Sequence, residues 1–256
     1  MPAALVDLAV TGHIATITLT APGALLDRAT SEALADAAHA AADSPEVRVV
    51  IVRGAGGDFC TGWAASALAE PDGMPGVPSL AAGIEALAAI PQPTIAAIRG
   101  RAHSAGLEAA LACDVRIAED GATFAMPDTA SGSVPRAGGT QRLPRAVGRA
   151  HALRLLLTGE IVDAAEARRI GLVSRVVPSG GTNLEDAARE LAEVIASRGP
   201  IATRLAKEAV HRGAEMTLEQ ALRYETDLTV ILQSTADRAE GVRAFQEKRE
   251  PKFLGE

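Results

Sequence analysis

The amino-acid sequence predicts an α/β fold, in which short strands alternate with helices through about the first 180 of its 256 residues. Two patterns indicate strands: apolar side chains at every second position in residues 13–20, and a run over residues 47–52 that is apolar except at Arg48. Between them, residues 30–42 carry apolar side chains at helical spacing. This alternation is typical of a mostly parallel sheet covered by helices.

The first elements follow from local patterns. Residues 13–20 predict a half-buried strand, because only alternate side chains are apolar. The helix over residues 30–42 has Thr30 or Ser31 available as its N-cap. Residues 47–52 predict a strand buried on both faces, and a glycine-rich loop follows it.

The middle of the chain continues the alternation. A strand is predicted over residues 94–98, and a helix of small residues follows over about 104–113. Further strands are predicted over residues 115–118 and 123–126, before a loop rich in Gly and Pro that extends to Gly139.

Beyond Pro178 the periodicity is helical only. The predicted helices cover residues 184–195, 201–210, 217–233 and 236–247. The sequence therefore predicts an α/β core over residues 1–180 and a helical region over residues 181–256. Helices added to a complete core must bury their apolar faces on that core or on a partner subunit.

Composition limits the classes of function. Hydrophobic residues make up 48% of the chain and the formal net charge is −7, which excludes intrinsic disorder and argues against nucleic-acid binding. The two cysteines, Cys60 and Cys113, cannot frame a disulfide scaffold. The sequence shows neither a signal-peptide pattern nor a long apolar run, so it predicts a cytoplasmic protein with no membrane partner.

Three segments stand out together. Residues 58–64 read Asp-Phe-Cys-Thr-Gly-Trp-Ala, residues 100–108 read Gly-Arg-Ala-His-Ser-Ala-Gly-Leu-Glu, and Met-Pro-Asp at 126–128 precedes Pro-Arg-Ala-Gly-Gly-Thr-Gln-Arg-Leu at 135–143. In this order and at these intervals they resemble the crotonase, or enoyl-CoA hydratase/isomerase, superfamily. Residues 156–166 and 245–253 extend the resemblance over nearly the whole chain.

The resemblance implies a fold, a substrate class and an assembly. The fold would be a crotonase-like spiral of β-β-α units, with a C-terminal helical trimerisation region that forms a homo-oligomer, either a trimer or a dimer of trimers. The substrate would be an acyl-CoA thioester. No separate cofactor is expected because coenzyme A is part of the substrate, and the scattered histidines give no metal site.

The resemblance also implies an oxyanion hole, made by the backbone N–H groups of Trp63 and Ala105. Such donors would face the thioester oxygen as it becomes negative in an enolate-like transition state. Small residues at Gly62, Ser104 and Gly106 would let the two segments approach each other closely.

Two carboxylates match the positions of the family's catalytic pair. Glu108 matches fully, whereas Asp128 is one methylene shorter than the usual glutamate. Adding water to a conjugated double bond needs one group to take a proton from water and one to deliver a proton to the α-carbon. Arg136 is a second departure, because hydratases of the family usually carry glycine there; its guanidinium would pair with a carboxylate, fill part of the pocket or point outward.

The resemblance assigns the substrate contacts as well. Trp63 would line the acyl pocket and favour a short, branched or cyclic acyl group, and residues 70–78 would form the loop that closes it. The remaining predicted contacts to coenzyme A are Leu25 and Leu26 at the adenine, Trp63, Ala64, Ala65 and Ser66 at the pantetheine arm, Arg136 near the reacting group, and Lys248 at the phosphates, in the same or a neighbouring subunit.

Several functions share these motifs. An enoyl-CoA hydratase acting on trans-2-enoyl-CoA fits best; a double-bond isomerase, another acyl-CoA-processing member such as a hydrolase, and a non-catalytic acyl-CoA binder stay open. A different class is an α/β-hydrolase with Ser104 as nucleophile, whose histidine would be His151 or His211. The glycines after Gly54 lack the register of a nucleotide-binding loop.

Overall fold

A six-stranded sheet forms the centre of the computed structural model, which describes residues 4–69 and 79–256. Its strand order is β1-β2-β4-β6-β8-β11. The first two strands form an antiparallel hairpin and the others pair in parallel. The strands are β1 (Val6–Thr11), β2 (Ile14–Leu19), β4 (Val49–Gly54), β6 (Thr94–Ile98), β8 (Val115–Glu119) and β11 (Arg175–Val177).

Short strands outside this sheet complete the spiral. Each of β4, β6 and β8 is followed by one of them, and a helix comes after each pair, so the predicted β-β-α repeat is confirmed. They form a two-stranded pair, β3 (Leu25–Leu26) with β5 (Gly62–Trp63), and a three-stranded sheet of β7 (Arg101–His103), β9 (Thr123–Ala125) and β10 (Val162–Asp163).

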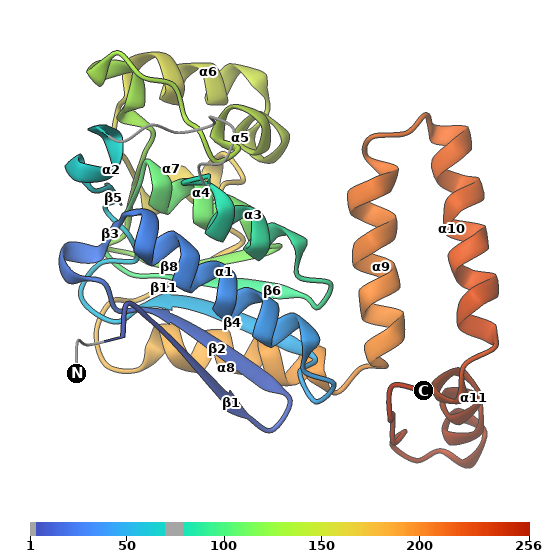
Figure 1. Cartoon of the computed structure of the whole chain (residues 1–256). Helices are drawn as coiled ribbons and strands as arrows, with labels where there is room; N and C mark the ends of the chain where they lie inside the picture. The colour runs from blue at the N-terminus through green and yellow to red at the C-terminus, as the bar shows by residue number, and fades with distance from the viewer. Residues whose placement is uncertain (1–3, 70–78) are drawn as a thin grey trace.

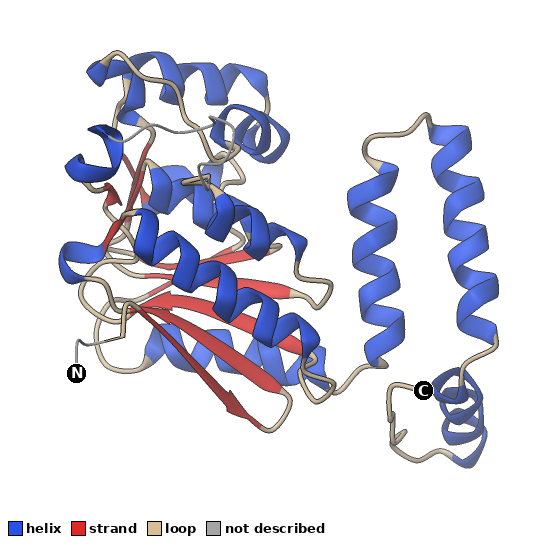
Figure 2. Ribbon diagram, viewed as in Figure 1, coloured by secondary structure: helices blue, strands red, loops and turns tan. Residues whose placement is uncertain are grey.

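Helices cover both faces of the central sheet (Figures 1 and 2). One buried cluster joins Val50 of β4 to α1 (Arg28–Asp43), α3 (Ala82–Ala89) and α4 (Ala105–Ala112). On the other face, Val49 belongs to a cluster with α8 (Asn183–Ala196). Alternate side chains of β4 therefore enter two cores, which confirms the prediction of a strand buried on both faces.

The beginning of α1 corrects one local prediction. The helix starts at Arg28, and its N-cap is Asp27 rather than Thr30 or Ser31. The Asp27 carboxylate accepts hydrogen bonds from the Thr30 backbone N–H at 2.8 Å and from the Thr30 hydroxyl at 2.7 Å. Aspartate is as good an N-cap as serine or threonine. The prediction began the helix where the apolar pattern begins, which is slightly after its actual first residue.

Further helices build the side of the core near β5. They are α2 (Ala65–Ala69), the 3-10 turns η1 (Pro22–Ala24) and η2 (Pro127–Ser131), α5 (Gly139–Val147), α6 (Arg149–Thr158) and α7 (Ala164–Arg169). None of the helices in the described ranges is long and apolar enough to cross a membrane.

The last three helices form an arm beside the core. Helices α9 (Pro200–Gly213) and α10 (Leu218–Gln233) run antiparallel, and α11 (Ala236–Glu247) lies at the end of the arm (Figure 1). The predicted division at residue 180 stays a prediction: α8 covers the central sheet, and only α9, α10 and α11 make up the arm.

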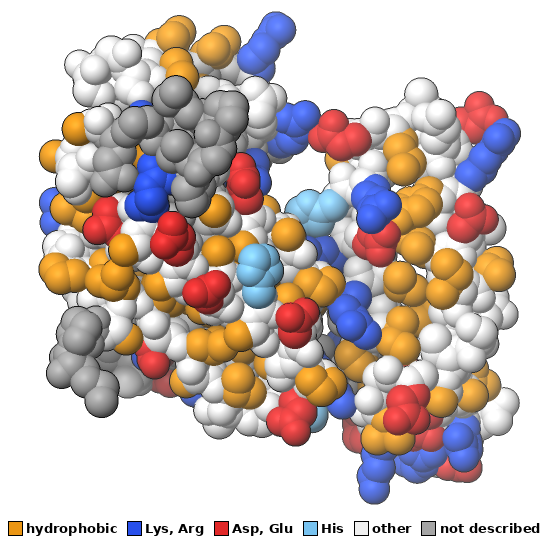
Figure 3. Space-filling view, viewed as in Figure 1, with side chains coloured by type: hydrophobic (Ala, Val, Ile, Leu, Met, Phe, Trp, Pro, Cys, Tyr) orange, Lys and Arg blue, Asp and Glu red, His pale blue; other side chains and the backbone are white. Residues whose placement is uncertain are grey.

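The arm exposes apolar side chains. Figure 3 shows hydrophobic groups along α9 and α10. Those with more than half of their surface exposed are Val210, Leu218, Leu222, Val230 and Ile231, together with Phe245 on α11.

Candidate active site

Pairing between a loop and β7 brings the two predicted oxyanion segments together. The Cys60 N–H donates to the Arg101 carbonyl at 3.0 Å, and the His103 N–H donates to the Cys60 carbonyl at 3.1 Å. This pairing places β5, which ends at Trp63, in contact with α4, whose first residue is Ala105. The two backbone segments expected to carry the N–H donors are therefore neighbours.

Small residues allow this close approach. At Gly106, an added Cβ would lie 2.9 Å from the Cys60 Cβ and closer still to the Cys60 carbonyl oxygen. At Gly62, where φ is +128°, an added Cβ would lie 3.4 Å from the Ser104 Cβ. Because the first N–H groups of a helix have no partner within the helix, the beginning of α4 also offers a favourable field to a negative oxygen.

A cavity of about 350 Å³ opens beside these segments. Its apolar wall includes Trp63, Leu68 and Pro127, and its polar wall includes Ser104 and Asp128. A volume of this size is in the range of small-molecule sites. Residues 70–78, which the sequence assigned to a loop closing this cavity, lie outside the described residues.

Glu108 lies in the first turns of α4 and is fully buried. Its Oε1 atom accepts hydrogen bonds from the backbone N–H groups of Ala137 and Gly139, both at 2.8 Å. Its Oε2 atom is enclosed and has no hydrogen-bond partner among the described residues. One oxygen is thus fixed by two hydrogen bonds, and the other keeps an unused capacity to accept one.

Burial raises the pKa of Glu108 above its ordinary value. The two backbone N–H groups lower this pKa, the nearby carboxylate of Asp128 raises it, and the charge of Arg142 lowers it. Burial has the largest effect, because it disfavours the charged form. A carboxyl group with a raised pKa can both take and give a proton nearer to neutral pH.

Asp128 lies in η2 and is mostly buried. Its Oδ1 atom accepts a hydrogen bond from the Ser104 hydroxyl at 2.8 Å, and its Oδ2 atom has no partner in the described part of the chain. Asp128 lines the cavity, whereas Glu108 is not among its described lining residues. The two predicted carboxylates are nevertheless close enough to interact, because the charge of Asp128 raises the pKa of Glu108.

Arg136 is half-buried in the segment between η2 and α5. The arginine whose charge affects the pKa of Glu108 is Arg142, on α5. The Arg142 guanidinium also donates to the Ala137 carbonyl at 2.7 Å, in the same segment that holds Glu108. Three orientations of Arg136 were left open from the sequence, with pairing to a carboxylate as one of them, and Arg142 was not identified.

Most predicted coenzyme A contacts cluster near β5. Leu25 and Leu26 pair with Gly62 and Trp63, and the Leu26 carbonyl accepts from the Ala64 N–H at 2.7 Å. The next two predicted contacts, Ala65 and Ser66, are exposed at the start of α2.

Lys248 does not join this cluster within one chain. It ends α11 with φ of +52° and is exposed. Figure 1 shows α11 at the end of the arm, on the far side of the core from β5 and α2. A contact between Lys248 and coenzyme A at this site therefore requires a second subunit.

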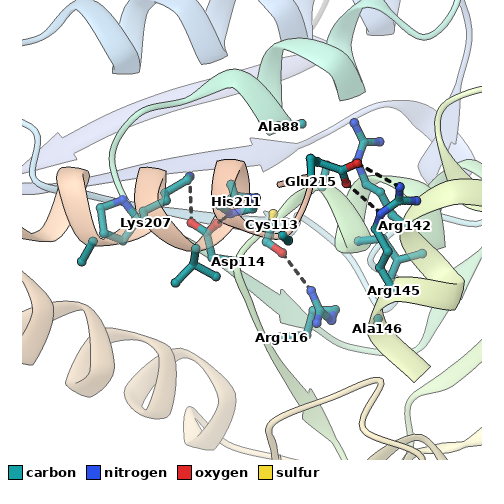
Figure 4. A pocket seen from close by; sticks show the side chains of 16 residues that line it. Ala88, Cys113, Asp114, Arg116, Arg142, Arg145, Ala146, Lys207, His211 and Glu215 are labelled. Atoms are coloured by element: carbon teal, nitrogen blue, oxygen red, sulfur yellow. Dashed lines mark hydrogen bonds and ion pairs between the residues drawn. The ribbon is translucent and has the colours of Figure 1, made fainter. Parts of the chain in front are cut away.

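A larger cavity, of about 750 Å³, lies between α9 and the end of α4 and is lined by none of the residues predicted for the acyl-CoA site (Figure 4). The Lys207 ammonium donates to Asp114 and to the carbonyls of Ile90 and Gln92 at 2.8 to 2.9 Å. His211 pairs with the other oxygen of Asp114. These contacts attach the arm to the core.

The contacts of Ser104 and His211 do not support the serine-hydrolase alternative. His211 pairs with Asp114 rather than with Ser104, and His151 lies on α6. Burial raises the pKa of Cys113 to about 12, so this thiol is not an activated nucleophile either. The hydroxyl of Ser104 is bonded to Asp128, a contact that sequence reasoning missed.

The chain matches the family model described as "Enoyl-CoA hydratase/isomerase" over residues 10–256. It is 40% identical to (E)-benzylidenesuccinyl-CoA hydratase of Thauera aromatica, over 98% of this chain and 99% of that one. It is 38% identical to the mitochondrial methylglutaconyl-CoA hydratase of Homo sapiens, over 87% of this chain and 68% of the relative.

Solved structures agree with these similarities. A crystal structure of enoyl-CoA hydratase from Bacillus anthracis superposes with a TM-score of 0.88 and 38% identity, over 98% of this chain and 100% of that one. An enoyl-CoA hydratase from Mycobacterium tuberculosis superposes with a TM-score of 0.90 and 30% identity, over 99% and 100% of the two chains. The chain belongs to the enoyl-CoA hydratase/isomerase, or crotonase, superfamily.

Proposed function

We propose that this protein hydrates a trans-2-enoyl-CoA. The observation that supports this reaction best is the arrangement of Glu108 and Asp128: each has one oxygen fixed by a hydrogen bond and one without a partner among the described residues. A water molecule can donate two hydrogen bonds, so two carboxylate oxygens without partners could accept one each and hold it.

The oxyanion hole supplies the first requirement of the reaction. With the thioester oxygen held by the N–H groups of Trp63 and Ala105, negative charge that develops on this oxygen is stabilised. Each donor contributes about 3–4 kcal/mol to the transition state. This polarisation draws electrons from the double bond and makes the β-carbon electrophilic.

The carboxylates supply the second requirement. Glu108 takes a proton from water while the water oxygen bonds to the β-carbon, and the electron pair of the double bond moves toward the thioester as an enolate. Asp128 serves as the second acid/base, and a protonated carboxyl group then delivers a proton to the α-carbon. The raised pKa of Glu108 matches this role, because the group must gain and lose a proton in each turnover.

The acyl group of the substrate is short, branched or cyclic in this proposal. The indole of Trp63 lines the cavity next to the proposed thioester position and takes up room that a long straight chain would need. Two relatives are named for benzylidenesuccinyl-CoA and methylglutaconyl-CoA, neither of which carries a straight-chain acyl group.

The proposal extends to assembly and location. Leu25, Leu26, Ala64, Ala65 and Ser66 would hold coenzyme A, and Lys248 of a second subunit would reach its phosphates. The apolar side chains exposed on α10 support a homo-oligomer, a trimer or a dimer of trimers. Both cysteines are unpaired and buried, which fits the reducing cytoplasm.

Hydration of crotonyl-CoA, followed as loss of the enoyl-thioester absorbance, tests the function. We expect activity in the wild type and none in Glu108→Gln, which keeps the side-chain shape but removes the proton acceptor. Glu32→Gln, at an exposed position of α1, is the matched control and keeps full activity.

Other outcomes would replace the proposal. An inactive wild type on a panel of 2-enoyl-CoA thioesters would contradict hydration. Conversion of a 3-enoyl-CoA to its 2-enoyl isomer, without hydration, would identify an isomerase. Acyl-CoA binding in calorimetry without any turnover would identify a non-catalytic binder.

A further inference from the structure

Ser104 occupies a strained position between β7 and α4. Its backbone has φ of +48° and ψ of −118°, and only Ala24 and Lys248 share a positive φ among the described residues other than glycine. Glycine adopts such angles without a steric penalty, whereas a side chain meets one. A serine at this point therefore needs a compensating contact, and strain of this kind is common at functional sites.

The Ser104 side chain makes that contact with Asp128. As the residue before the first turn of α4 it could cap the helix, yet it makes no capping hydrogen bond. Its hydroxyl instead donates to the Asp128 Oδ1 atom at 2.8 Å, and both residues line the cavity of the candidate active site. The Ser104 N–H also donates to the Ala125 carbonyl at 2.9 Å, which ties this turn to the strand that leads into Asp128.

Within the described chain, this hydrogen bond is the only one to the carboxylate of Asp128. The hydroxyl of Ser131 and the N–H of Ser133 donate to the Asp128 carbonyl, so they fix the backbone but leave the side chain able to rotate. With Oδ1 fixed by Ser104, rotation about the Cβ–Cγ bond is restricted. The Oδ2 atom, which has no partner, then keeps one orientation.

We propose that Ser104 is a positioning residue, whose hydroxyl orients the short carboxylate of Asp128 for its part in hydration. This inference depends on the proposed role of Asp128 as the second acid/base. It assigns Ser104 and Asp128 as one unit and gives a reason for a serine at a position where glycine would be unstrained.

Ser104→Gly gives the sharpest test, because it removes the hydroxyl and the strain together. We expect the melting temperature to stay the same or rise, while kcat for crotonyl-CoA falls about 10- to 100-fold and KM stays within about twofold. Ser104→Ala removes the hydroxyl but keeps the Cβ, so kcat falls by the same factor without a gain in stability. Ser197→Ala, at the exposed serine that follows α8, is the control for loss of a hydroxyl elsewhere.

A double-mutant cycle with Asp128→Asn separates positioning from a structural role. If Ser104 acts through Asp128, Ser104→Gly has no further effect on kcat in the Asp128→Asn background. A second full loss of kcat there, or a Ser104→Gly variant as active as the wild type, would overturn the inference. Covalent acylation of Ser104 by an acyl-CoA, detected by mass spectrometry, would also overturn it, because Ser104 would then be a nucleophile.

The same cycle distinguishes the inference from the proposed function. If Asp128→Asn alone leaves hydration unchanged, the acid/base role of Asp128 fails, and the proposed positioning fails with it. If Asp128→Asn is impaired but Ser104→Gly is not, only the role of Ser104 fails.

Discussion

The close approach of α4 to the Cys60 loop should control catalysis, and Gly106→Ala tests this directly. An added Cβ at position 106 would lie 2.9 Å from the Cys60 Cβ, whereas ordinary contacts begin near 3.4 Å. The carbonyl oxygen of Cys60 lies closer still, so the two segments must separate by more than about 0.5 Å. Ala105 belongs to one of these segments and Trp63 follows directly on the other.

This separation should weaken the proposed oxyanion hole. A displacement on the scale of an ångström can cost about 100-fold in rate, so we expect kcat for crotonyl-CoA hydration to fall about 10- to 100-fold in Gly106→Ala. Overpacking also costs about 1–3 kcal/mol in the free energy of unfolding, partly offset by about 1 kcal/mol because alanine favours the helix more than glycine does. Urea unfolding and steady-state kinetics measure the two effects separately.

Gly56→Ala is the matched control. Position 56 has no heavy atom within 4 Å of an added Cβ and does not require a positive φ, so the control should keep wild-type activity and stability. Wild-type kcat in Gly106→Ala would refute the reasoning. It would show that catalysis does not depend on the close approach of the two backbone segments.

Three further perturbations test other parts of the structure. Burial raises the pKa of Glu108, so just above pH 4.5 the folded protein still binds a proton that the unfolded chain has lost. The free energy of unfolding of the wild type should therefore fall relative to that of Glu108→Gln as the pH rises from about 4.5 through the folded-state pKa. Parallel pH profiles of the two proteins in urea unfolding would contradict this. Trp63→Ala enlarges the cavity and should raise kcat/KM for long-chain relative to short-chain enoyl-CoA; an unchanged ratio would show that Trp63 does not select the acyl group. Lys207→Met leaves the mostly buried Asp114 without its ammonium partner and should lower the free energy of unfolding in urea by about 3 kcal/mol. Lys252→Met is the exposed control, and equal stability of both variants would rule out anchoring of the arm by Lys207.

Long patterns in the sequence predicted the main elements because their signals extend over several residues. Five apolar residues among the six at 47–52 predicted β4, and small residues around Ala105 predicted α4. The strands β3, β5 and β10 have two residues each, which is too short to show an alternation, so no local signal could place them. These short strands nevertheless position Leu26 beside Trp63 in the site.

The candidate site was predictable where its residues lie in ordered motifs, and not where it depends on contacts between them. Glu108 and Asp128 could be named from sequence, but the Ser104 hydrogen bond joins residues 24 positions apart and exists only because η2 folds over the start of α4. The effect of Arg142 on the pKa of Glu108 also depends on a contact between distant segments, so Arg136 was named from the sequence instead.

The start of α4 connects all of these contacts. Ala105 would supply a donor to the thioester, Ser104 holds Asp128, and Glu108 projects from the next turn toward the N–H groups of Ala137 and Gly139. A helix of eight residues therefore fixes the position of Glu108 relative to the oxyanion donor, and the residue before the helix holds Asp128 beside them. Because Ala105 and Glu108 lie on this helix and Asp128 is hydrogen-bonded to the residue before it, a shift of the first turn disturbs all three groups. For this reason Gly106→Ala should reduce kcat more than a substitution of similar size elsewhere in the core.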